Sequence, residues 1–103
     1  MFAAIYEFKT HPNQVLEFIE AWEALTLLLR EYEGALGSRL HQQGDNNFIA
    51  YAQWPSLEIY EAAGNNLPEH ATHWREKMRK ACESITTLHQ LNVVKDLLIH
   101  PSK

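Results

Sequence analysis

Basic residues, cysteine and long apolar runs are all scarce in this sequence, and each scarcity excludes a class of protein. Lysine and arginine number 9 against 13 acidic residues, so the formal net charge is -4 at pH 7. We therefore expect no nucleic-acid partner, because phosphate binding requires a cationic surface. No apolar run approaches the roughly 20 residues that cross a bilayer, so we also expect no membrane span.

Cysteine occurs once, at Cys82. A single cysteine cannot form an internal disulfide, which favours a reducing compartment. The residues after Met1 carry neither a basic region nor a cleavage signal, so we expect a cytoplasmic protein. The sequence also lacks a glycine-rich phosphate loop and a nucleophile elbow, and readings as a nucleotide-binding or acyl-transfer protein therefore have no support.

Length and composition predict one globular domain over residues 1–103. Hydrophobic residues make up 46% of the chain and charged residues 21%, which is ordinary for a folded protein. The length is close to the common size of a domain with a single core. No repeat, linker or low-complexity segment divides the chain.

The clearest structural signal is a hairpin over residues 36–56. A Gly/Asp/Asn turn at residues 43–47 separates two β-type runs, and the second run stops at Pro55. One face of the second strand carries Phe48, Ala50, Ala52 and Trp54, and the other carries Ile49, Tyr51 and Gln53. Neither face is charged, so both faces are expected to be covered.

A strand and a long helix are predicted before the hairpin. Alternation over residues 2–9 predicts a strand. Helical spacing of apolar residues then predicts a helix of about twenty residues that begins near Pro12 and ends before Gly34. At about 30 Å, such a helix is long enough to cross a whole sheet.

Two helices and a strand are predicted after the hairpin. Ser56 is placed to cap a short helix over residues 57–63. Pro68 opens a third helix, whose apolar stripe consists of Ala71, Trp74, Met78, Cys82 and Ile85. In this stripe Cys82 is expected to be inert packing. Residues 88–99 are predicted to form the last strand and a tail.

This order of elements predicts an α+β fold, the ferredoxin-like plait (βαββαβ), in which both long helices lie on one face of an antiparallel sheet. The other face carries either Ile5, Ile49 and Tyr51 or the residues that alternate with them along the strands. Burial of each large apolar side chain is worth about 1.5–3 kcal/mol, so leaving a whole face exposed is unfavourable. We therefore expect a homodimer in which two sheets pair face to face around a twofold axis.

Residues 37–41 (Gly-Ser-Arg-Leu-His) and 50–56 (Ala-Tyr-Ala-Gln-Trp-Pro-Ser), together with the plait and the chain length, resemble the antibiotic biosynthesis monooxygenase (ABM) domains. The resemblance runs over nearly the whole chain. It implies a dimeric α+β barrel with a ligand cleft between the helices and the sheet of each protomer. It also implies a cofactor-independent monooxygenase that acts on a small aromatic or quinol-like substrate. A non-catalytic dimer that binds a small apolar molecule is the alternative, because fold alone does not determine function.

Cofactor-free oxygenation needs a proton acceptor, hydrogen bonds to a phenolate and a dry pocket. The resemblance implies Trp54 as a cleft wall with an indole N–H, because the family places a Trp at the end of the third strand. Tyr60 would donate to a substrate oxygen, and His73 would act as a general base. Each of the three also has an alternative role in packing or at the surface. We expect all three to face one cavity between helix and sheet.

Neither a metal nor another cofactor is expected. His70 and His73 share a helix face, but no cysteine or clear carboxylate completes a ligand set. His73 falls near the position at which haem-degrading relatives place their axial ligand. Those relatives also require an Asn on the first strand and a Trp on the short helix, where this chain carries Tyr6 and Tyr60. The departure disfavours haem degradation.

Arg39 and His41 are predicted to lie on one face of the second strand, beside Tyr51 and Gln53. One interpretation is a polar cluster, formed by Arg39, His41 and Gln53, that binds an anionic oxygen of the substrate. The alternative is a hydrogen-bonded patch at the dimer interface, where Arg and Tyr are enriched. We favour the interface, because paired sheets need polar groups to fix their register.

Overall fold

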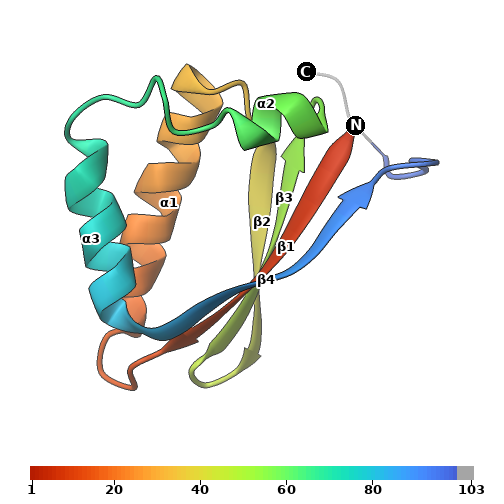
Figure 1. Cartoon of the computed structure of the whole chain (residues 1–103). Coiled ribbons are helices and arrows are strands. Elements are labelled where there is room, and N and C mark those ends of the chain that lie inside the picture. The colour runs from red at the N-terminus through yellow and green to blue at the C-terminus, as the bar shows by residue number, and fades with distance from the viewer. Residues whose placement is uncertain (100–103) are drawn as a thin grey trace.

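Two long helices lie on one face of a four-stranded sheet in the computed structural model, which describes residues 1–99 (Figure 1). The elements are β1 (Phe2–Thr10), α1 (Val15–Tyr32), β2 (Gly37–Gly44), β3 (Asn47–Trp54), α2 (Leu57–Glu61), α3 (Ala71–Ala81) and β4 (Cys82–Asn92). The strand order is β2-β3-β1-β4, and every neighbouring pair is antiparallel. The predicted plait is therefore confirmed.

The core lies between α1 and the two central strands. Phe18 of α1 is fully buried, and its ring centroid lies 4.9 Å from that of Phe8 and 5.3 Å from that of Phe48. Phe8 and Phe48 are directly opposed across β1 and β3. The alternation that predicted these strands therefore also selects the side chains that α1 covers.

The long helix begins three residues later than predicted. Helix α1 starts at Val15, and Pro12 lies in the preceding turn, where the Gln14 N–H donates to the His11 carbonyl at 3.0 Å. Gly34 follows the helix with a φ of 77°, a conformation that glycine adopts without steric cost. The prediction of Pro12 as the first helical residue was wrong, because this turn redirects the chain before the helix can start.

The third helix and the last strand also differ from the prediction. Helix α3 ends at Ala81, so Cys82 and Ile85 belong to β4. The last strand therefore begins at Cys82, before the strand and tail predicted over residues 88–99, and it ends at Asn92. The pairing explains this shift, because Thr10 lies opposite Cys82 and Phe8 opposite Ile85. Strand β1 needs hydrogen-bond partners along its whole length, and this requirement overrides local helical spacing. The short helix α2 likewise ends at Glu61 rather than at residue 63.

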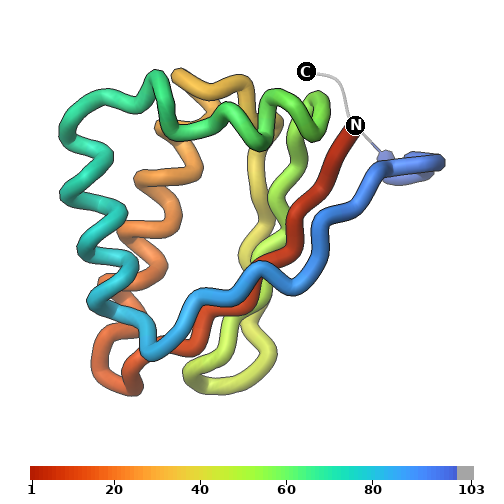
Figure 2. The backbone as a smooth tube through the Cα atoms, in the orientation of Figure 1, coloured from red at the N-terminus to blue at the C-terminus, as the bar shows by residue number. Residues whose placement is uncertain are grey.

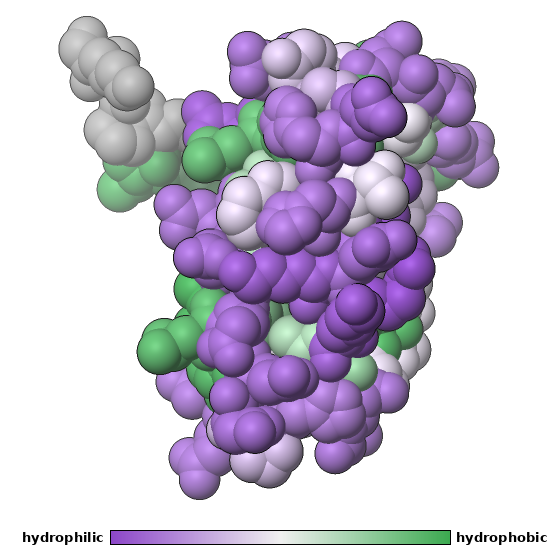
Figure 3. All heavy atoms as spheres, turned by 90° about the vertical axis from the view of Figure 1, so that its left-hand side faces the viewer, coloured by the Kyte–Doolittle hydropathy of each residue, from purple (hydrophilic) through white to green (hydrophobic). Residues whose placement is uncertain are grey.

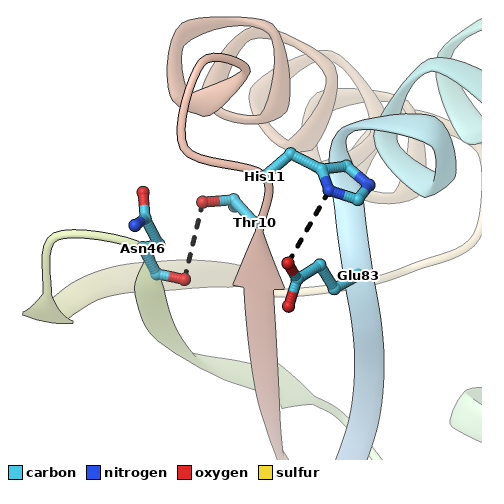
Figure 4. Close-up of polar contacts among 4 residues, drawn as sticks. All are labelled: Thr10, His11, Asn46 and Glu83. Carbon is cyan, nitrogen blue, oxygen red and sulfur yellow. Dashed lines mark hydrogen bonds and ion pairs between the residues drawn. The ribbon is translucent and has the colours of Figure 1, made fainter.

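Contacts at one end of the sheet join β1 to both of its neighbours (Figure 4). Thr10 Oγ1 donates to the Asn46 carbonyl at 3.5 Å, and His11 Nδ1 lies 3.9 Å from Glu83 Oε1. The His11 N–H also donates to the Ala81 carbonyl at 2.9 Å. These bonds fix the junction at which α3 passes into β4.

The two faces of the molecule differ in what covers them. The surface on the side of α3 is mainly hydrophilic (Figure 3). The sheet face opposite the helices, called the open face here, carries the half-buried side chains of Ile5, Ile49 and Tyr51. After β4, Val94 is 94% exposed and Ile99 is 91% exposed. Among residues 1–99, no helix is both long and apolar enough to cross a membrane.

Candidate functional site

A cavity of about 250 Å³ lies between the sheet and the two long helices. Its wall includes Tyr6, Phe8, Trp22, Leu25, Thr26, Leu29, Ala35, Gly37, Ser38, Ala52, Trp54, Leu67, Arg75, Met78 and Ile85. The alternation of β1 and β3 directs Tyr6, Ala52 and Trp54 toward the helices. Most of the wall is apolar, so this helix–sheet cavity suits a small ligand with an apolar body.

Trp54 provides a buried polar atom at this cavity. The side chain is 4% exposed, and its Nε1 has no hydrogen-bond partner among the residues that the structure describes. A buried donor without a partner costs about 1–3 kcal/mol. Its ring meets Tyr60 edge to face, with centroids 5.6 Å apart. The end of β3 therefore holds an indole N–H in a dry setting with no acceptor from residues 1–99.

Tyr6 and Tyr60 form a hydroxyl pair beside Trp54. Tyr6 Oη donates to Tyr60 Oη at 3.1 Å, and Gln90 Nε2 donates to the same Tyr60 oxygen at 3.4 Å. Burial raises the pKa of Tyr6 above its usual range, and donation to Tyr60 raises it further. Tyr6 lines the helix–sheet cavity, whereas Tyr60 is not among its wall residues.

His73 lies outside the cavity. The side chain is exposed in the first turn of α3, and its ring contacts Trp74 with centroids 4.8 Å apart. Ala71 is buried, and His73 follows it by slightly more than half a helical turn, so the two point in different directions. Of the three residues predicted to face one cavity, Trp54, Tyr60 and His73, only Trp54 is therefore among its wall residues.

Arg75, rather than His73, is the charged or basic residue of α3 that lines the cavity. It follows Ala71 by four residues, so it returns to the side of the helix that faces the sheet. Its side chain lines the cavity and is exposed at residue level, which places it at the rim. Arg75 forms no ion pair with another residue of the described chain. It thus adds a positive charge to an otherwise mostly apolar wall.

Glu33 fixes the segment between α2 and α3, which passes over the end of α1 (Figure 2). The residue is 7% exposed, and its Oε2 accepts from the backbone N–H groups of Gly64 and Asn66, both at 2.8 Å. Burial raises the pKa of this carboxyl, but hydrogen bonds from Asn66, Gly64 and Leu67 outweigh that effect, so the pKa is lowered overall. The bonds hold Leu67 in the cavity wall.

Arg39, His41 and Gln53 lie together on the open face rather than at the cavity. Arg39 is opposite Tyr51 and His41 is opposite Ile49 in the β2–β3 register. All three line a shallow hollow of about 650 Å³, to which Leu98 and Ile99 also contribute. The sheet separates this polar cluster from Trp54 and Tyr6.

Residues 1–77 match the sequence profile of the antibiotic biosynthesis monooxygenase family. The chain belongs to this family. No curated protein matches the sequence.

Solved structures share the ABM fold at low sequence identity. SnoaB, a cofactor-independent oxygenase from Streptomyces nogalater, is 16% identical over 93% of this chain and 95% of its own, with a TM-score of 0.70. A protein from Nitrosomonas europaea proposed to be an antibiotic biosynthesis monooxygenase is 14% identical over 92% and 100% of the two chains, with a TM-score of 0.74. Rv0793 from Mycobacterium tuberculosis is 15% identical over 91% and 98%, with a TM-score of 0.66. At such identities, the likeness establishes the fold alone.

Two further observations concern the metal-ligating and thiol side chains of this ABM domain. Within residues 1–99, no three His, Cys, Asp or Glu side chains gather closely enough to hold a metal ion. Cys82 is buried, and burial raises the pKa of its thiol to about 11. The thiol therefore stays protonated at neutral pH and is a poor nucleophile.

The sequence interpretation missed three residues of this ABM site: Tyr6, Glu33 and Arg75. A signal for Tyr6 was present, because it is the one tyrosine on the helix-facing side of a strand that carries Phe2, Ala4 and Phe8 there. A signal for Arg75 was also present, because it follows Ala71 of the predicted stripe by four residues. No local pattern marks Glu33, because its partners lie more than thirty residues further along the chain.

Proposed function

We propose that the chain is a cofactor-independent monooxygenase that oxidises a small aromatic or quinol-like substrate in the helix–sheet cavity. The observation that carries this proposal is the buried Trp54 N–H, which finds no acceptor among the described residues and stands beside an apolar cavity. Membership of the ABM family supports the reaction class. The cavity volume of about 250 Å³ lies below the roughly 300–1,000 Å³ of common ligand sites, which favours a substrate of one or two rings.

The proposed reaction converts a phenol to a quinone with molecular oxygen. A ring C–H opposite the hydroxyl becomes a carbonyl, and one oxygen atom enters the substrate. The second oxygen atom leaves as water with the hydrogens of that C–H and of the hydroxyl, so the substrate supplies all the electrons. The protein needs to promote loss of the hydroxyl proton, stabilise the phenolate and exclude bulk water.

Residues of the cavity wall match these needs. Trp54 would donate its N–H to the developing phenolate, which is worth more in a dry site than in water. Arg75 at the rim would favour the ionised substrate through its positive charge. His73 is exposed and is not a wall residue of the cavity, so the role of base is not assigned to it.

The test is a screen of mono- and bicyclic phenols and dihydroxyaromatics, with oxygen uptake as the readout and no metal or flavin added. We expect uptake with at least one such compound, and a loss of about 100-fold in Trp54→Phe, since one stabilising donor can contribute about 3 kcal/mol in the transition state. Trp74→Phe is the matched control, because Trp74 is half-buried on α3 and is not a wall residue of the cavity. Tight binding of these compounds without any uptake would instead support the non-catalytic binding protein.

We also propose that the open face pairs with a second copy of the chain in the cytoplasm. Ile5, Ile49 and Tyr51 are only half-buried in one protomer, and Val94 and Ile99 are almost fully exposed. A twofold pairing would cover these apolar side chains. The cluster of Arg39, His41 and Gln53 would then help to set the register of the two sheets. A stable monomer in sedimentation equilibrium at micromolar concentration would contradict this assembly.

A further inference from the structure

We propose that Tyr6 contacts the hydroxyl of the bound ligand, and that the Tyr6–Tyr60 pair carries the proton of this hydroxyl toward the surface. This proposal rests on the proposed function, in which the helix–sheet cavity holds an aromatic ligand. It assigns the contact to Tyr6 on β1 and places Tyr60 beyond Tyr6, on the side away from the cavity.

The hydroxyl pair connects the cavity to the outside of the protein. Tyr6 is directed toward the helices opposite the small Ala50, and its side chain forms part of the cavity wall. Its hydroxyl lies 3.1 Å from that of Tyr60 on α2, which is not a wall residue. Beyond it, Gln90 of β4 is exposed and lies 3.4 Å from the Tyr60 oxygen. Three elements thus form one hydrogen-bonded path.

The directions of these hydrogen bonds define what the ligand must offer. The hydrogen of Tyr6 points to Tyr60, so the Tyr6 oxygen is left to accept a hydrogen bond from the cavity side. The ligand must therefore present a hydroxyl donor at this point, while Trp54 remains available for an acceptor atom. A phenol satisfies Tyr6, and its methyl ether does not.

The same arrangement allows a balanced proton transfer. The ligand hydroxyl gives its proton to the Tyr6 oxygen while the Tyr6 proton passes to Tyr60 and the Tyr60 proton leaves to water. Both tyrosines end as neutral phenols, the ligand becomes a phenolate, and no electrons move between protein and ligand. The Tyr60 oxygen accepts from both Tyr6 and Gln90, so its own hydrogen points away from them. Burial and donation to Tyr60 keep the pKa of Tyr6 high, which suits a neutral relay rather than a stored anion.

Binding of 1-naphthol and of 1-methoxynaphthalene, measured by calorimetry, tests the contact. We expect Tyr6→Phe to weaken naphthol binding about fivefold to tenfold, the usual value of one hydrogen bond, and to change methoxynaphthalene binding less than twofold. Tyr32→Phe, an exposed tyrosine at the end of α1, should change neither. Equal losses for both compounds would overturn the proposal while leaving the cavity as a ligand site. If the unaltered protein binds neither compound, the proposed function fails as well.

A second variant tests the direction of the hydrogen bond between Tyr6 and Tyr60. It also keeps the proposal testable if Tyr6→Phe does not fold. In Tyr60→Phe the Tyr6 hydrogen loses its acceptor and becomes available to the cavity. Methoxynaphthalene should then bind about fivefold more tightly, because its oxygen can accept from Tyr6. The most alkaline step in the ultraviolet titration of the tyrosines should also move to lower pH, because donation to Tyr60 no longer adds to the effect of burial on the pKa of Tyr6. Unchanged methoxynaphthalene affinity together with an unchanged titration would overturn the pairing.

Discussion

The two faces of the sheet offer different kinds of site, although adjacent residues of β3 serve both. Trp54 is buried toward the helices, while Gln53 faces the open side and accepts from the Tyr51 hydroxyl at 3.5 Å. The helix–sheet cavity is small and mostly apolar, and it has few polar groups. The hollow on the open face is larger, shallow and lined by Arg39 and His41. Neighbouring residues of one sequence motif thus lie on opposite faces of the sheet, some at the dry cavity and others at the exposed surface.

The largest effect on stability should come from a substitution in the core, on the side of the sheet that the helices cover. Phe18 is fully buried against Phe8 and Phe48, so Phe18→Ala should reduce the free energy of unfolding by about 3–5 kcal/mol. Leu16→Ala, on the exposed side of the same helix, should change it by less than about 0.5 kcal/mol. Urea denaturation of both variants provides the measurement. A similar loss in the two variants would place the core elsewhere.

A change of one residue on either face should separate the two candidate sites. Ala52 lines the helix–sheet cavity, and Gln53 lines the hollow on the open face. Ala52→Leu should fill the cavity and weaken binding of 1-naphthol about 100-fold, which corresponds to about 2.7 kcal/mol. Gln53→Leu should leave this affinity within about twofold. The reverse pattern in calorimetry would move the aromatic site to the open face.

The contribution of Glu33 to the free energy of unfolding should depend on pH. At pH 7, Glu33→Gln should reduce the free energy of unfolding by about 1–3 kcal/mol, because the N–H groups of Gly64 and Asn66 lose the charged acceptor that the buried Glu33 provides. The pKa of Glu33 is lowered from its ordinary value of 4.5, so its contribution is complete above pH 4.5 and is lost as the pH falls through the lower, folded-state value. The difference between variant and wild type should therefore shrink below pH 4.5. Glu31→Gln, exposed near the same helix end, is the control, and an equal effect there would remove the role of Glu33.

Strand alternation was sufficient to predict most of the fold. It placed Phe8 and Phe48 under a helix and fixed the order of elements. It could not place the junction between α3 and β4, because Cys82 and Ile85 are three residues apart, which fits helical spacing; only the register shift between Lys9 and Thr10 brings them opposite Thr10 and Phe8 in the sheet. The choice depends on the length of β1, whose Thr10 pairs with Cys82. A boundary set by a partner far along the chain leaves no local signal.

The candidate site was less predictable for a related reason. Trp54 came from the family resemblance, and the structure places it at the cavity. Tyr6 was not assigned to the site, because a pattern of apolar alternation carries no information about a hydroxyl group. His73 was considered from its position in the family, although the predicted stripe of Ala71 and Met78 already pointed it away from the sheet, since the direction of each side chain changes by about 100° per residue.

The smallest expected effect tests which side chains of α3 face the cavity. His73 is exposed and Arg75 lines the cavity, so His73→Ala should change both 1-naphthol affinity and oxygen uptake by less than about twofold, as surface substitutions usually do. Arg75→Ala should weaken binding of the ionised form of a phenol more than that of its methyl ether, because only the anion is attracted by the guanidinium charge. Calorimetry and oxygen uptake on the two variants give the comparison. If His73→Ala alone abolished uptake, a base outside the observed cavity would be required, and α3 would have to turn to bring it in. If neither variant changed anything, α3 would serve only to cover the sheet, and the chemistry would rest on β1 and β3.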